Sequence, residues 1–312
     1  MRIAAMAAGA VGGYFGARLA AAGHEVFFIA RGANLAAIKA NGLKIESVHG
    51  DLHLPKVNVT DDPKSVGPVD VVLFAVKLWD TEKAAELTKP MVSEATRVIT
   101  LQNGVDSVER LTPILGAEQT VGGVTYIATT IAAPGVIKHT SAFAKMSFGQ
   151  DPKLADKKQD ATLDQFVAAG KAAGLDLGLS PDITAERWKK FIFLTAMSGS
   201  TATFRSSIGP IAADPELRDF FRQLMEEAYA VGRASGVALD HSIVDERMAQ
   251  ITGNIEPGMK ASMAHDLARG NRLELDWLSG KVRSLGRELG IPTPASDIVC
   301  KVLKLHRMGQ PS

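Results

Sequence analysis

Cysteine is almost absent from this 312-residue chain, whose one cysteine is Cys300. A single cysteine cannot form an intrachain disulfide, and no cysteine and histidine residues recur at the spacing of metal ligands. We therefore expect a reducing compartment, the cytoplasm, and a functional site without a metal ion.

A surplus of one charge is also missing, because 35 lysine and arginine residues nearly balance 34 aspartate and glutamate residues. The net charge of +1 lacks the one-sided field with which proteins attract nucleic acid. Glycines interrupt the apolar start of the chain, residues 1–22, so it lacks the continuous apolar core of a signal peptide. We expect a small-molecule partner, with no nucleic acid and no membrane.

Short apolar runs alternate with helical patterns in the first half of the chain, which is typical of a parallel sheet with crossover helices. The expected strands are residues 2–6, 25–30, 69–76 and 97–101, and the expected helices are 10–22, 34–41, one from 81 and one after 104. After residue 120 we expect antiparallel strands at the edge of the sheet, then a helix over about 155–173 and a strand near Leu175.

Amphipathic helical patterns replace the strand signal from Asp182 onward, so we place a domain boundary at residue 180. Gly270-Asn271 interrupts a helical pattern, and a new helix is expected to begin at 272–274. The later apolar positions, Leu278 and Val282 with Trp277, suit a core or the face of a homodimer, and the core is preferred.

A glycine-rich turn follows the first expected strand. Gly9 and Gly12 occupy the last two glycine positions of the dinucleotide-binding pattern G-x-G-x-x-G, and Ala7 occupies the first. Gly9 would let a pyrophosphate approach the helix N-terminus, and Gly12 would let helix and strand pack closely. We expect Ala7 to make the turn with a negative φ. The expected cofactor-binding turn is Ala7, Ala8, Gly9, Ala10, Val11 and Gly12.

Polar side chains follow three further expected strands. An NAD-binding domain usually ends its second strand with a carboxylate, but this chain has Arg31 at that place. A guanidinium can bind the 2′-phosphate of NADP, so we expect NADP as the cofactor. The alternative is that Arg31 is a solvated surface arginine. Lys77 and Asn103 follow the next strands, at the edge where ligands bind open α/β sheets. Lys77 could touch the cofactor, and Asn103 could bind cofactor or substrate, although turn chemistry alone also explains Asn103-Gly104.

A lysine on an expected helix is the candidate general acid. Lys190, Leu194, Ser198 and Thr201 recur at helical spacing, so the lysine shares a stripe with apolar and small residues. Burial lowers the pKa of an amine, which could then donate a proton to a carbonyl oxygen as a hydride arrives. A snorkelling surface lysine is the alternative.

The sequence resembles the ketopantoate reductase (2-dehydropantoate 2-reductase) family over nearly its whole length. The resemblance rests on G-A-V-G at 9–12, A-V-K at 75–77, Q-N-G at 102–104, W-K-K at 188–190, and S-M-x-x-D at 262–266 with E-x-D at 274–276. It implies an α/β protein with an N-terminal Rossmann-type doubly wound sheet, the NADP-binding domain (1–180), and a C-terminal all-helical substrate and catalytic domain (181–312).

The resemblance also implies roles for individual residues. Lys190 would be the general acid, Glu274 would engage the reacting oxygen of the substrate, Ser262 would help bind the carboxylate, and Asn103 would lie near nicotinamide and substrate. The implied reaction is NADPH-dependent reduction of 2-dehydropantoate to pantoate, in pantothenate biosynthesis. We further expect Lys190 and Glu274 to form a buried charge pair.

The chain departs from the family at two substrate-binding positions. Leu194 and Ser198 stand where the family typically has asparagines, so the substrate could be a different 2-keto acid, with a bulkier side chain or without ketopantoate's hydroxyl. An imine, an opine-type reaction, a 6-phosphogluconate-like decarboxylation, and a sensor that binds NADPH without turnover remain as alternatives.

Overall fold

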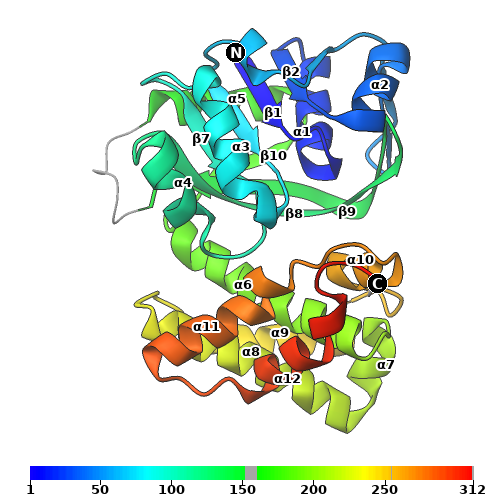
Figure 1. Cartoon of the computed structure of the whole chain (residues 1–312), viewed down its shortest axis with the longest axis vertical. Helices are drawn as coiled ribbons and strands as arrows, with labels where there is room; N and C mark the ends of the chain where they lie inside the picture. Colours follow the sequence, from blue (N-terminus) through cyan, green and yellow to red (C-terminus); the bar gives the residue numbers. More distant parts are fainter. Residues whose placement is uncertain (152–159, 254, 311–312) are drawn as a thin grey trace. The chain divides into compact units, whose positions relative to one another are not determined.

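The computed structural model describes residues 1–151, 160–253 and 255–310, which form two compact units, Met1–Ile183 and Thr184–Ser312 (Figure 1). The first unit is built on a sheet with helices on both faces, and the second is helical. The predicted fold class, a doubly wound α/β domain followed by an all-helical domain, is confirmed.

Four adjacent parallel strands form the middle of the sheet. They are β1 (Arg2–Met6), β2 (Glu25–Ile29), β6 (Val71–Phe74) and β7 (Arg97–Thr100), in the order β7-β6-β1-β2. Their crossover helices are α1 (Ala10–Ala21), α2 (Gly32–Asn41), α3 (Thr81–Thr88) and α4 (Ser107–Leu115). The strands are apolar because parallel strands covered by helices are buried on both faces.

Alternate side chains of β1 enter two separate cores. Ile3 and Ala5 pack into the same core as Phe15 of α1, whereas Ala4 and Met6 join the core that contains Leu111 of α4. Strand β1 is therefore packed on both of its faces, and this packing fixes the point at which the following turn begins.

A long antiparallel hairpin, β8 (Thr120–Ala133) and β9 (Val136–Gly149), continues the sheet beyond β7. The prediction that these strands lie at the edge is wrong, because β3 (Leu43–Ser47) pairs in parallel with β9 and β4 (Leu52–Leu54) pairs with β3. The full order is β4-β3-β9-β8-β7-β6-β1-β2-β5. The remaining elements of this unit are β5 (Asn58–Thr60), β10 (Asp176–Leu179), which pairs with β9, and α5 (Ala161–Ala172). Residues 155–159 of the helix predicted over 155–173 lie outside the described residues.

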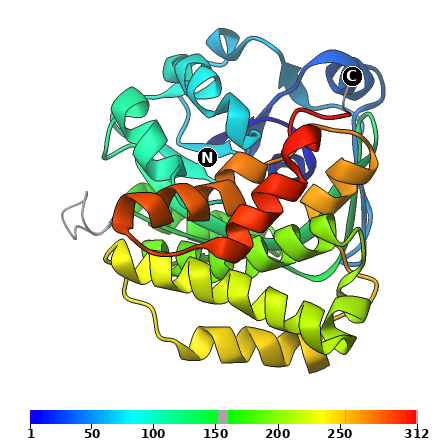
Figure 2. The same ribbon diagram turned by 60° about the horizontal axis from the view of Figure 1, so that its bottom comes forward.

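The second unit consists of helices, of which α8 and α9 lie side by side (Figure 2). The helices are α6 (Ile183–Thr203), α7 (Ile208–Ala213), α8 (Pro215–Ala234), α9 (Ser242–Gly253), α10 (Ser262–Ala268), α11 (Ser279–Leu289) and α12 (Pro294–Val302). Short 3-10 turns occur in both units at Pro63–Ser65, Leu78–Asp80, Lys89–Met91, Leu275–Trp277 and Lys304–His306. Leu278 and Val282 are fully buried, so these two side chains belong to the core of this unit.

The break at Gly270 separates two helices, as the sequence indicates, but the second helix begins later than predicted. Gly270 has a φ of 68°, and regular helix resumes only at Ser279. The amide of Leu273 donates to the carbonyl of Arg307 at 3.0 Å, so the C-terminal segment holds this stretch in place of helical hydrogen bonds. Glu274 consequently lies in a loop, directly before the 3-10 turn Leu275–Trp277.

Candidate functional site

The turn between β1 and α1 has two glycines with different environments. A Cβ atom at Gly12 would lie 2.5 Å from the carbonyl oxygen of Ala7, so the strand-to-helix packing requires glycine there. A Cβ atom at Gly9 would meet no atom within 4 Å, and the φ of Gly9 is an ordinary −83°. The space beside Gly9, at the N-terminus of the 12-residue helix α1, is therefore open to a ligand.

Ala7 adopts a φ of 75°, so the expectation of a negative φ is wrong. The neighbouring contacts impose the left-handed conformation: the Ala7 carbonyl faces Gly12, and the amide of Ala8 donates to the carbonyl of Ile29 at 2.7 Å. A left-handed alanine costs about 1–2 kcal/mol, which the surrounding structure has to offset. Strained residues of this kind cluster at functional sites.

The loops after β2, β6 and β7 carry the other predicted cofactor residues. Arg31 follows β2 and is exposed, Lys77 follows β6 and is exposed, and Asn103 follows β7 and is half-buried. The Lys77 ammonium lies 5.6 Å from the centre of the Trp79 ring. Because the three strands and β1 are neighbours and parallel, these loops and the glycine turn share one edge of the sheet, where open α/β sheets bind ligands.

Gln102 is a residue whose contribution the sequence analysis missed. Its buried amide nitrogen donates to the carbonyl of Val76 at 3.1 Å and to the hydroxyl of Thr81 at 2.8 Å. Gln102 thereby joins the loop that carries Lys77 to the loop that carries Asn103. An amide directly after an apolar strand is the signal that could have identified it, because a buried amide must find partners.

In the second unit, α6 carries Lys190, Leu194 and Ser198 on one stripe. Lys190 and Leu194 are half-buried, and Ser198 is fully buried. Burial lowers the pKa of Lys190 to about 8, and the negative charge of Glu274 limits this decrease. Glu274 is itself 6% exposed. An amine with this pKa is largely protonated near neutral pH and yet is a stronger acid than an ordinary lysine.

Ser262, the remaining predicted substrate residue, is the first residue of α10. The amide of the preceding residue, Ala261, donates to the hydroxyl of Thr201 at 3.3 Å, and that hydroxyl donates to the carbonyl of Met197. Thr201 is fully buried on the same stripe of α6 as Ser198. The start of α10 is therefore tied directly to the helix that carries Lys190.

Two kinds of site are not found in the described parts of the chain. Within residues 1–151, 160–253 and 255–310, no three histidine, cysteine, aspartate or glutamate side chains gather as metal ligands would. Over the same ranges, no helix combines the length and the apolar character needed to cross a membrane.

Comparison with known proteins places both units in one family. Residues 3–153 match the family model "Ketopantoate reductase PanE/ApbA", and residues 182–307 match "Ketopantoate reductase PanE/ApbA C terminal". The chain is 30% identical to the 2-dehydropantoate 2-reductase of Mesorhizobium japonicum, over 97% of each chain. It is likewise 30% identical to the uncharacterized oxidoreductase YkpB of Bacillus subtilis, over 98% of this chain and 99% of that one.

The solved structures agree with this assignment. The PanE/ApbA family ketopantoate reductase of Ralstonia eutropha superposes with a TM-score of 0.88 at 34% identity, covering 98% of each chain. A D-mandelate dehydrogenase in complex with NADH and anilino(oxo)acetate has the same fold, with a TM-score of 0.89 at 21% identity and 98% coverage of each chain. The predicted family and enzyme class are confirmed: the chain belongs to the ketopantoate reductase family and is an NADP-dependent oxidoreductase.

Proposed function

We propose that this protein uses NADPH to reduce a 2-keto acid to the 2-hydroxy acid, with 2-dehydropantoate as the first candidate substrate. The first unit holds NADPH, and the second unit binds the keto acid and supplies a proton. The observation that carries the proposal is Lys190, a half-buried amine whose pKa is lowered to about 8, in the field of the buried carboxylate of Glu274.

The edge of the sheet suits an NADP molecule. The open space beside Gly9 admits the pyrophosphate to the free amides of Ala10 and Val11 at the N-terminus of α1. Arg31 is exposed and offers a guanidinium for the 2′-phosphate, and Lys77 and Asn103 offer hydrogen bonds to the ribose and nicotinamide end. When bound, NADPH supplies the hydride.

The residues of the second unit donate the proton and bind the substrate. As hydride reaches the carbonyl carbon, negative charge develops on the carbonyl oxygen, and the Lys190 ammonium gives that oxygen a proton. Glu274 keeps Lys190 protonated and accepts a hydrogen bond from the hydroxyl that forms. The hydroxyl of Ser262 helps to bind the substrate carboxylate.

The identity of the keto acid depends on α6. Leu194 and Ser198 offer no amide, so they favour a keto acid with an apolar side chain as the second candidate. The shared fold of a D-mandelate dehydrogenase, which acts on an aryl acid, makes such an acid worth testing. The single cysteine, Cys300, is buried and suits the reducing cytoplasm, where we place the enzyme.

The test is NADPH oxidation with 2-dehydropantoate and a panel of aliphatic and aryl 2-keto acids, repeated for L194N and S198N. Turnover of 2-dehydropantoate, raised by either variant, supports the first candidate. Turnover of only apolar keto acids supports the second. NADPH binding without turnover of any keto acid contradicts the proposal and favours an imine substrate or a cofactor sensor.

A further inference from the structure

Asn34, in the first turn of α2, joins two segments that are far apart in the sequence. Its amide nitrogen donates to the carbonyl oxygen of Ala8 at 2.9 Å, and its amide oxygen accepts a hydrogen bond from the backbone N–H of Gly135 at 2.8 Å. The side chain is half-buried. Both ends of this amide are therefore engaged, one on the glycine turn and the other on the tip of the β8–β9 hairpin.

The bond to Ala8 fixes the orientation of two successive peptide planes. The amide of Ala8 donates to the carbonyl of Ile29 at 2.7 Å, and the carbonyl of Ala8 is held by Asn34. The C=O and the N–H of a trans peptide point in opposite directions. Because the Ala8 carbonyl points toward α2, the N–H of Gly9 points to the opposite side of the turn.

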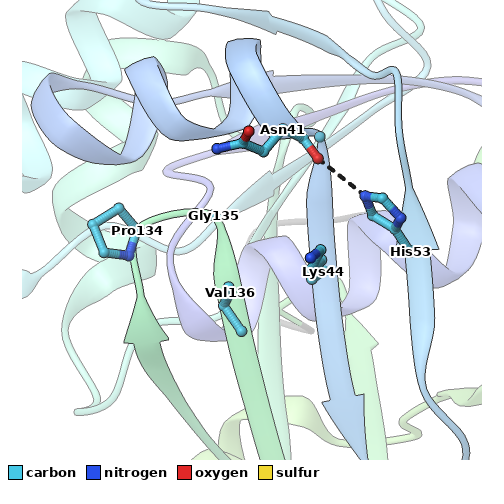
Figure 3. Close-up of a pocket in the computed structure, with 7 residues that line it drawn as sticks. Asn41, Lys44, His53, Pro134, Gly135 and Val136 are labelled. Carbon is cyan, nitrogen blue, oxygen red and sulfur yellow. Dashed lines mark hydrogen bonds between the residues drawn. The ribbon is translucent and has the colours of Figure 1, made fainter.

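The hydrogen bond from Gly135 fixes the orientation of the Asn34 amide, because Gly135 is itself held in place by its neighbours. Gly135 has a φ of 76°, and its carbonyl accepts a hydrogen bond from the amide of Lys44 at 2.9 Å. Figure 3 shows this hairpin tip, Pro134 to Val136, beside Lys44 of β3 and Asn41 at the end of α2. A Cβ atom at Gly135 would lie 3.4 Å from Ala37, so the tip packs directly on α2.

We propose that Asn34 is a positioning residue for the cofactor: it holds the Ala8 carbonyl away from the pyrophosphate so that the Gly9 amide can face it. A carbonyl oxygen directed at a phosphate would repel it, whereas an amide hydrogen attracts it. The turn needs the hydrogen bond from Asn34 because Ala7, which precedes Ala8, has a strained φ of 75°. Rotation of the peptide after Ala7 could relax this strain. This inference rests on the proposed NADPH site, but it does not depend on which keto acid is reduced.

The test compares N34A and N34L with N41A, an exposed asparagine at the end of the same helix, as the matched control. NADPH dissociation constants are measured by cofactor fluorescence, and kcat and the keto acid KM are measured at saturating NADPH. We expect the dissociation constant to rise about tenfold in N34A and N34L, as loss of one hydrogen bond predicts, with kcat and the keto acid KM within about twofold of the wild type. N41A should match the wild type.

Amide hydrogen exchange provides a readout that does not involve activity. Exchange should accelerate in N34A at Gly135 and around the glycine turn, and it should be unchanged in N41A. NADPH affinity in N34A and N34L within twofold of the wild type would overturn the inference and leave the proposed function intact. If the wild type binds NADPH but reduces no keto acid, the proposed function fails, and a tenfold loss of affinity in N34A still supports the role of Asn34.

Discussion

Replacing Gly12 with alanine should destabilise the first unit, whereas replacing Gly9 should leave it almost unchanged. The Cβ atom of G12A would lie 2.5 Å from the Ala7 carbonyl oxygen and 3.3 Å from the Cβ of Ala75. Relief requires a backbone shift of about 1 Å, since non-bonded carbon contacts settle near 3.5 Å. Such overpacking costs about 1–3 kcal/mol, and the helix propensity of alanine returns about 0.5–1 kcal/mol. The difference between these ranges is about 0–2.5 kcal/mol, and because the nearest atom belongs to the backbone and cannot swing aside as the end of a side chain could, we expect a loss of about 1–2 kcal/mol.

G9A is the matched comparison because its Cβ meets no atom within 4 Å and its φ suits alanine. Only the change of N-cap residue remains, at a cost below about 1 kcal/mol. Calorimetry should show a Tm lowered by about 2–8 °C for G12A and by less than about 3 °C for G9A. If the proposed NADPH site is correct, both variants should bind NADPH at least tenfold more weakly. The added methyl of G9A would occupy the space that we propose for the pyrophosphate, and G12A would shift the turn that binds it. A G12A protein as stable as the wild type, or a G9A protein with full NADPH affinity, would refute this reasoning.

Three further predictions concern strain and protonation. A7G should raise the unfolding free energy by up to about 1.5 kcal/mol in urea titrations, since it removes left-handed strain of about 1–2 kcal/mol and adds about 0.5–1 kcal/mol of chain entropy cost. As the proposed general acid, Lys190, whose pKa is about 8, would have to be protonated to act, so kcat/KM for reduction should fall as pH rises through about 8. In E274Q this fall should move to lower pH, and an unmoved profile would contradict the role of the carboxylate. Burial lowers the pKa of His139 below its unfolded value, so the stability it contributes is present above about pH 6.5 and is lost at lower pH. Unfolding in urea at pH 7 and pH 5 should show this loss, and H139Q should reduce it.

The parallel strands at the centre of the sheet are predictable because burial on both faces leaves them continuously apolar. The strands β3, β4 and β5 carry no such signal, because each is partly exposed and polar residues interrupt its apolar ones. These strands form by pairing: β3 pairs with β9, β4 with β3, and β5 with β2. The partner of β3 lies far away in the sequence, and sequence periodicity does not identify the partners of β4 and β5. Because the pairing of β3 with β9 leaves no signal in the sequence, the β8–β9 hairpin was predicted to lie at the edge of the sheet.

The site shows a similar division. The residues after each parallel strand are predictable from topology alone, because all such strands end at one edge. The conformation of Ala7 is not, because alanine itself favours a negative φ and only the contacts of Gly12 and Ile29 impose the positive one. The bonds of Asn34 to Ala8 and Gly135 span 26 and 101 residues, and sequence spacing carries no information at such separations.

The most direct test of the central claim is NADPH-dependent keto acid reduction by K190A and by K189A, in which the neighbouring, exposed lysine of α6 is removed. Loss of the general acid should lower kcat in K190A by about 10²–10⁴-fold while NADPH affinity stays within twofold of the wild type. K189A should retain wild-type kcat. A K190A enzyme within tenfold of wild-type kcat, or an equal loss in both variants, would contradict the assignment of Lys190 as the proton donor.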